Sequence, residues 1–212
     1  MSPVWRYHTR CTPMQIRSAD RSVIKAIRQR SLLTEWSRRH FESGEQLSSL
    51  DSFRPDFFEE EKDDMLIYEV ADCSTEPRLI IRYDGQRLSQ AYAKVGKGSA
   101  LQDVMGPKRA AVILPIYYAC VQRRLPIYSI CAATDVHGTQ VNFERLLLPF
   151  GANGHVTDLI ASVKTISVDG SFEQKQLLRI DEAPLFSLIA AIDTGIVAQA
   201  GAKAISDDLE VI

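Results

Sequence analysis

The stretch that decides the fold of this protein runs from Gly106 to Ser167 and reads GPKRAAVILPIYYACVQRRLPIYSICAATDVHGTQVNFERLLLPFGANGHVTDLIASVKTIS. Its first part has the apolar pattern of a helix. Three strands follow, which we expect at Pro126–Thr134, Val141–Phe150 and His155–Ser167. The links between them, DVHG and GANGH, are short and rich in residues that supply the positive φ angles of hairpin turns. The stretch therefore predicts a helix followed by an antiparallel meander.

The chain upstream of this stretch completes a sheet. Met65–Ala71 and Leu79–Asp84 are rich in β-branched and aromatic residues and predict two more strands. A short helix is expected at Gln86–Lys94. The fold class is thus α+β, with a five-stranded antiparallel sheet and helices on one face. The run Leu146–Leu148 breaks the alternation, which indicates that its strand is either buried on both faces or bulged near Pro149.

The N-terminal part of the chain holds a candidate dimer helix. Residues 1–19 are expected to be an arm, with a short strand as an option. A helix capped by Ser18 or Asp20 should then run to about Phe41. Its apolar stripe needs a cover, either from its own domain or from a second copy. We expect a homodimer formed through four residues of this stripe, Ile27, Leu32, Leu33 and Trp36.

The chain divides into an arm (1–19), a domain that includes the N-terminal helix (20–168) and a C-terminal extension (169–212). The extension is expected to be helical, with helices at Pro184–Ala191 and Ile196–Ile205. A weakly apolar stretch, Ala183–Ala202, carries Asp193 near its middle. A carboxylate at that depth of a bilayer is costly, so no membrane span is expected.

Charge and composition restrict the function. The 212 residues carry a net charge of -2, so direct binding to nucleic acid is not expected. Residues 1–50 hold nine Lys/Arg against four Asp/Glu, whereas residues 51–72 hold two against nine. The two segments are either solvated faces, or the basic one docks on the acidic one. Four scattered cysteines give no zinc or redox motif, and without a signal peptide a cytoplasmic protein is expected.

Three pieces of sequence resemble the PAS domain, and in particular the alphaproteobacterial single-domain PAS family, from about Ile24 to Ile166. The first is LLTEW at 32–36. The second is IRYDGQRL at 81–88 with GKGSAL at 96–101, similar to the family's R-x-x-G-x-x-L and G-x-x-L pattern. The third is RLPIY at 124–128 with FERLLLPF at 143–150. The resemblance implies a sensory or interaction module that holds a small ligand or dimerises.

The resemblance also allows cofactors to be tested on the residues. Covalent flavin chemistry requires a reactive cysteine, and Ser99–Met105 holds none. A haem ligand would be a histidine on the long helix, and Gly106–Arg124 holds none. No cofactor is therefore assigned, and no metal site or catalytic motif is expected. A ligand pocket between the sheet and the short helices would have as its wall Tyr68, Ile81, Tyr83, Tyr92, Leu101, Tyr117 and Phe143. The alternative is that these side chains simply fill the core.

Two functional hypotheses stay open, and a third is weaker. The first is a stand-alone PAS-type signalling module that binds a small ligand or a partner protein and acts by contact. The second is a ligand-free structural adaptor whose basic N-terminal helix binds an acidic partner. An enzyme on a related α+β fold is the third, since the sequence contains no recognisable catalytic motif.

Overall fold

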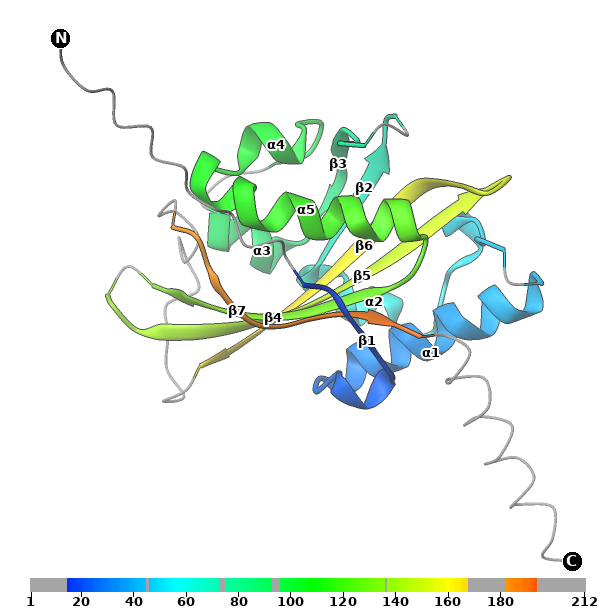
Figure 1. Ribbon diagram of the computed structural model, residues 1–212, viewed down its shortest axis with the longest axis horizontal. Coiled ribbons are helices and arrows are strands. Elements are labelled where there is room, and N and C mark those ends of the chain that lie inside the picture. Colours follow the sequence, from blue (N-terminus) through cyan, green and yellow to red (C-terminus); the bar gives the residue numbers. More distant parts are fainter. Residues whose placement is uncertain are drawn as a thin grey trace, which may run out of the picture.

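A single seven-stranded sheet with helices on both faces forms the molecule, seen in a computed structural model (Figure 1). The structure describes residues 15–44, 46–72, 75–92, 96–135, 137–167 and 182–193. The strand order is β1-β7-β4-β5-β6-β2-β3. The strands are β1 (Arg17–Ala19), β2 (Met65–Val70), β3 (Leu79–Asp84), β4 (Ile127–Thr134), β5 (Gln140–Ala152), β6 (His155–Ser167) and β7 (Leu185–Ile192). The α-helices are α1 (Ile27–Glu42), α2 (Phe58–Glu61), α3 (Gln86–Tyr92), α4 (Leu101–Val104) and α5 (Pro107–Arg123). Short 3-10 turns are η1 (Arg21–Val23), η2 (Leu50–Ser52) and η3 (Lys62–Asp64).

The predicted helix and meander are confirmed. Helix α5 begins with Pro107, whose missing N–H costs nothing at a first helical position. It ends at Arg123, and the capping residue that follows, Arg124, adopts a left-handed conformation with φ 57°. Strands β4, β5 and β6 then pair antiparallel in sequence order, and β2 pairs with both β6 and β3. The α+β class and the PAS-like element order, two strands, short helices, a long helix and three strands, are therefore confirmed.

The C-terminal extension corrects one prediction. Pro184–Ala191, expected as a helix, contains β7, which pairs antiparallel with β4. The segment is rich in residues that accept either structure, and the free edge of β4 supplies a ladder of backbone hydrogen bonds that decides for a strand. Strand β1 then pairs parallel with β7, so both flanks join the sheet. The predicted helix Ile196–Ile205 lies outside the described residues.

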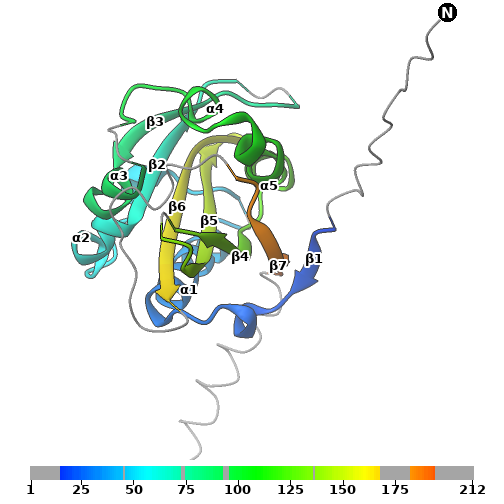
Figure 2. The ribbon, with the colours of Figure 1, turned by 90° about the vertical axis from the view of Figure 1, so that its left-hand side faces the viewer.

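Burial on both faces of the sheet corrects a second prediction, that helices cover one face. One core lies under α3, α4 and α5, and a second core lies under α1 and the segment that leads to α2 (Figure 2). The leucine run of β5 shows why. Leu147 belongs to the first core, whereas Leu146 and Leu148 belong to the second, and all three are fully buried. The strand is thus buried on both faces, as the broken alternation indicated, and the β5–β6 register also shifts next to Gly151.

Candidate functional site

Helix α1 packs one narrow face on the sheet and leaves the other face to solvent. Its buried positions are Gln29, Leu32, Leu33 and Trp36, a spacing that places them on one side of an α-helix. The indole Nε1 of Trp36 donates a hydrogen bond of 2.7 Å to the carbonyl oxygen of Pro149 in β5. The amide of Gln29 donates to the backbone oxygens of Glu144 and Ser162. The helix is therefore fixed in rotation as well as in position.

The apolar stripe of α1 that was expected to form a dimer packs on the chain's own sheet. The side chains of Leu32, Leu33 and Trp36 are buried under the chain's own sheet, so they are not available to a second copy in this arrangement. Ile27 alone among the four is exposed, at 71% of its surface. The helical period identified a buried face correctly, but it does not tell an intramolecular cover from an intermolecular one. Dimerisation itself stays a prediction.

The start of α1 is held by a buried carboxylate. The Oε2 atom of Glu144 accepts a hydrogen bond of 3.1 Å from the backbone N–H of Ala26, which precedes the helix. A negative charge at this end is stabilised by the helix dipole. The hydroxyl of Tyr128 accepts from Lys25 N at 3.3 Å, and burial raises the pKa of this phenol. These contacts fix the start of α1, where Ile27 is exposed to solvent.

The outer face of α1 forms one wall of a groove of about 740 Å³. The segment 54–57, which precedes α2, forms the opposite wall, and η1 contributes one arginine. Five arginines and two carboxylates line the groove, together with hydroxyl and apolar groups. The lining residues are Arg21, Ile27, Arg30, Ser31, Thr34, Glu35, Arg38, Arg39, Arg54, Pro55, Asp56 and Phe57. The groove is therefore positively charged, with apolar contacts available at Ile27 and Phe57.

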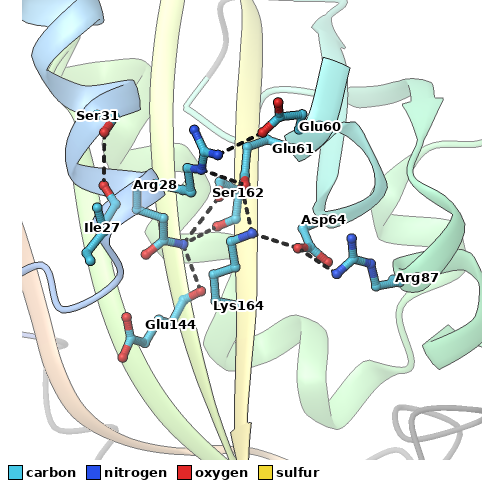
Figure 3. Close-up of polar contacts among 11 residues, drawn as sticks. Ile27, Arg28, Ser31, Glu60, Glu61, Asp64, Arg87, Glu144, Ser162 and Lys164 are labelled. Carbon is cyan, nitrogen blue, oxygen red and sulfur yellow. Dashed lines mark hydrogen bonds and ion pairs between the residues drawn. The ribbon is translucent and has the colours of Figure 1, made fainter. Parts of the chain in front are cut away.

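Arg28 joins the two walls. Its guanidinium Nη2 lies 2.7 Å from Glu60 Oε2 and its Nε lies 3.7 Å from Glu61 Oε1, so it connects α1 with α2 (Figure 3). The same guanidinium lies over the ring of Phe57, 5.4 Å from the ring centre. The interpretation that a basic segment docks on an acidic one within the chain is thus supported by this contact.

A partly buried lysine links α2 and the turn that follows it to the sheet. Figure 3 shows Lys164 of β6 between two carboxylates, with its Nζ 2.5 Å from Glu61 Oε2 and 2.6 Å from Asp64 Oδ2. Arg87 of α3 approaches Asp64 Oδ2 at 3.3 Å. Both carboxylate side chains are nearly buried, so the lysine compensates charges that solvent cannot reach. This network holds α2, which follows the groove segment 54–57, against the sheet.

The arginines of the groove differ in their availability. Arg38 contacts Glu35 and Glu42, and Arg39 contacts Glu35. Partial burial acts to raise the pKa of Glu35, but hydrogen bonds from Arg38 and Arg39 outweigh it, and the pKa of this carboxyl is lowered. Within the described ranges, Arg30 makes no ion pair.

Arg21 and Arg54 extend this set of available cations. Arg54 donates to the backbone oxygens of Leu50 and Phe53 and makes no ion pair to a described residue. Arg21 lines the groove from η1, which follows β1, and likewise makes no ion pair in the described part of the chain. Three exposed guanidinium groups can therefore receive an anionic ligand.

The residues expected to line a ligand pocket lie in the interior, where most of them pack against each other. Tyr68, Ile81, Leu101, Tyr117 and Phe143 belong to one buried cluster. The rings of Tyr68 and Tyr117 meet edge to face at 5.5 Å between centres, and their hydroxyls are 3.5 Å apart. Beside Phe143 lies a cavity of about 10 Å³, the size that one water molecule occupies.

The two remaining pocket candidates fall elsewhere. Tyr83, near the end of β3, is half-buried, and partial burial raises the pKa of its phenol. Tyr92 is the last residue of α3, and its side chain lies outside the part of the structure that is described. Five of the seven pocket candidates therefore share one apolar core, and a ligand role for them stays a prediction.

Neither a metal-binding cluster nor an accessible thiol is found within the residues that the structure describes. Among the described residues, no group of three or more His, Cys, Asp or Glu side chains converges in a way that could hold a metal ion. The thiol of Cys120 is buried and donates to the backbone oxygen of Leu125, and burial raises the pKa of that thiol. The pKa of Cys131 is raised by burial as well. Arg109 and Arg145 act to lower the pKa of Cys131, but burial outweighs them, and neither Cys120 nor Cys131 has the accessible setting of a reactive cysteine.

Apart from Ile27, the residues that line the groove are not among the site residues predicted from the sequence. Arg21, Arg30, Arg54 and Phe57 were not selected as site residues. The excess of basic residues in 1–50 was a signal for them, but it could not separate arginines paired within the chain from arginines left available. Arg28, on the same helix, proved to be a structural link.

In the part of the chain described, none of the helices has both the length and the apolar character needed to span a bilayer.

Comparison with known proteins gives limited guidance. No protein-family model matches the chain, and no curated protein sequence matches it. Two solved structures are similar over 50% of this chain. One is described as "Flavin Analogue Sheds Light on Light-Oxygen-Voltage Domain Mechanism", with a TM-score of 0.38, 13% identity and 78% of its own chain covered. The other is the light-state structure of the blue-light photoreceptor Aureochrome1 LOV, with a TM-score of 0.37, 12% identity and 84% covered. Likenesses at this level do not establish a cofactor or a function for this chain.

Proposed function

We propose that this protein is a PAS-type signalling module that acts by protein–protein contact, and that it binds an acidic segment of a partner in the groove along α1. The proposal joins the first sequence hypothesis, a PAS-type module, with the second, a basic helix that receives an acidic partner. It makes the protein a binding module, not an enzyme. Membership of the alphaproteobacterial single-domain PAS family, a cytoplasmic location and homodimer formation stay predictions from the sequence.

The observation that carries the proposal is the groove itself. Its 740 Å³ volume, its five arginines and its apolar contacts fit a segment that mixes carboxylates with apolar side chains. Arginine suits such a ligand, because its guanidinium forms bidentate hydrogen bonds with carboxylates. The walls are braced by Arg28 and Lys164, so the groove does not have to be assembled when a partner arrives.

The interior supports binding at the surface over binding inside. The side chains expected to enclose a ligand contact one another, and the cavity at Phe143 is far smaller than the several hundred Å³ typical of a small-molecule site. A module with this interior would transmit a signal through a partner protein bound at its surface. Native mass spectrometry of the purified protein checks this point: the mass of the bare chain is expected, and a small molecule at one copy per chain would contradict it.

A peptide-binding experiment tests the groove. The probe is a fluorescein-labelled peptide of alternating Asp and Leu, and a matched peptide of Asn and Leu is the neutral control. We expect the acidic peptide to bind and its affinity to fall as salt is raised from 50 to 300 mM, because exposed charges are screened. The Arg30→Glu, Arg54→Glu double variant should bind at least about 10-fold more weakly, since close charge pairs contribute on this scale.

The matched control is Arg123→Glu, which reverses an exposed arginine at the end of α5, outside the groove. It should leave the affinity for the acidic peptide unchanged. If the double variant binds the peptide as tightly as the parent protein, or if Arg123→Glu weakens binding equally, the acidic segment does not bind in this groove.

A further inference from the structure

The described chain ends beside the groove. Strands β1 and β7 pair in parallel, with Ala19 opposite Ile192, and the N–H of Asp193 donates to the backbone oxygen of Ala19 at 2.9 Å. Arg21, which lines the groove, follows Ala19 by two residues. Figure 2 shows β7 and β1 side by side at this edge of the sheet. Asp193 therefore lies close in space to Arg21, one of the residues that line the groove.

The sequence that follows has the composition that the groove selects. Residues 194–205 read TGIVAQAGAKAI and carry no carboxylate side chain. Residues 206–212 read SDDLEVI, and in them Asp207, Asp208 and Glu210 are interleaved with Leu209, Val211 and Ile212. We refer to residues 206–212 as the acidic tail. It combines three carboxylates with three apolar side chains, a composition complementary to the arginines and the exposed Ile27 of the groove.

We propose that the acidic tail of this chain occupies the groove along α1 of the same molecule, and that an acidic partner must displace it. The inference rests on the proposed function, because it assigns an internal competitor to the same groove. The tail would then be an autoinhibitory segment, and its release would switch the module on.

The connection is long enough for this contact. The twelve residues 194–205 separate Asp193 from the tail. A chain of twelve residues can span at most about 40 Å, and α1, with its 16 residues, is about 24 Å long. The length of the connection is therefore compatible with a tail bound anywhere along α1. A tether of this length gives the tail an effective concentration on the order of 1 mM at the groove. A tail that binds the groove with a dissociation constant of about 50 μM would therefore be bound in most molecules.

The test measures competition in the full-length chain. The probe is a fluorescein-labelled peptide with the sequence of residues 204–212, AISDDLEVI, followed by fluorescence anisotropy. The variant neutralises the tail with Asp207→Asn, Asp208→Asn and Glu210→Gln. We expect this variant to bind the probe about 10-fold more tightly than the parent chain, because the internal competitor no longer holds the groove.

The matched control removes three carboxylates elsewhere, by Asp51→Asn, Glu76→Gln and Glu182→Gln. These side chains are exposed, and the groove lining does not include them. This control should bind the probe with the parent's affinity. A control that binds as tightly as the tail variant would show a general charge effect and would overturn the proposal.

Other outcomes separate the proposal from the function on which it rests. If the parent and the tail variant bind the probe equally, and Arg30→Glu with Arg54→Glu abolishes binding, the groove takes acidic segments but its own tail is not the occupant. If neither protein binds the probe, the proposed function fails together with the inference. A parent chain that is a dimer by mass, with a monomeric tail variant, would place the tail on a second copy and overturn the intramolecular contact.

Discussion

Substitution of Trp36 by phenylalanine separates a core role for α1 from a role in a dimer interface. The side chain of Trp36 is 1% exposed and donates its indole N–H to the oxygen of Pro149 at 2.7 Å. Phenylalanine removes the donor and leaves a buried carbonyl oxygen without that bond, at a cost of about 1–3 kcal/mol. The smaller ring also leaves unfilled volume, which adds about 1 kcal/mol. We therefore expect the free energy of unfolding to fall by about 2–4 kcal/mol.

Chemical and thermal denaturation measure this loss. A change of 1 kcal/mol moves the melting temperature of a chain of this size by about 2–4 °C, so the Tm of Trp36→Phe should fall by roughly 5–15 °C. The control is Phe41→Leu on the same helix, where the side chain is 66% exposed and the Tm should stay within about 1 °C. Sizing chromatography should give the same mass for both variants. A Trp36→Phe protein that keeps its Tm but loses half its mass would place Trp36 in a dimer interface and refute the packing argument.

Three further predictions concern the network behind the groove, a buried thiol and a tight turn. Lys164→Met should lower the free energy of unfolding by about 3–5 kcal/mol, because Glu61 and Asp64 lose their shared cation, and urea titration measures it; an additional Asp64→Asn should recover part of the loss. Iodoacetamide should modify Cys120 only after unfolding, since burial raises the pKa of its thiol. Peptide mass mapping measures the labelling, and equal labelling of Cys120 in native and denatured protein would contradict this prediction. Gly151→Ala would put a Cβ 1.9 Å from a backbone oxygen of β6, so a loss of about 1–3 kcal/mol is expected in the same titration, and unchanged stability would disprove the close approach.

Local pattern was sufficient where each segment's own residues carried the information. The meander could be predicted because its links hold the Gly, Asn and Asp residues that hairpin turns require, and Asn153 and Gly154 do adopt positive φ angles. The run Leu146–Leu148 indicated a strand buried on both faces, and its three side chains do divide between two cores. That run contradicted the prediction of helices on one face, and it was the better guide.

Local pattern failed where two structures were equally compatible with the residues. Leu185–Ile192 has no strong preference for helix or strand, and its pairing with the open edge of β4 decided for a strand. The α1 stripe likewise fits any apolar cover, and the chain's own sheet supplied it. The predicted pocket residues did converge, but only packing shows whether converging side chains leave a space or close it.

The α+β class, the helix that precedes three consecutive strands and the apolar face of α1 could all be predicted from the amino-acid sequence, because each depends on turn residues and periodicity within a short window. The tertiary structure alone decided which arginines remain available. Arg28 and Arg30 are two residues apart on one basic helix, yet the first is paired with Glu60 and the second faces an open groove. Charge composition is a property of the chain, whereas the partner of each charge depends on which surfaces the fold brings together.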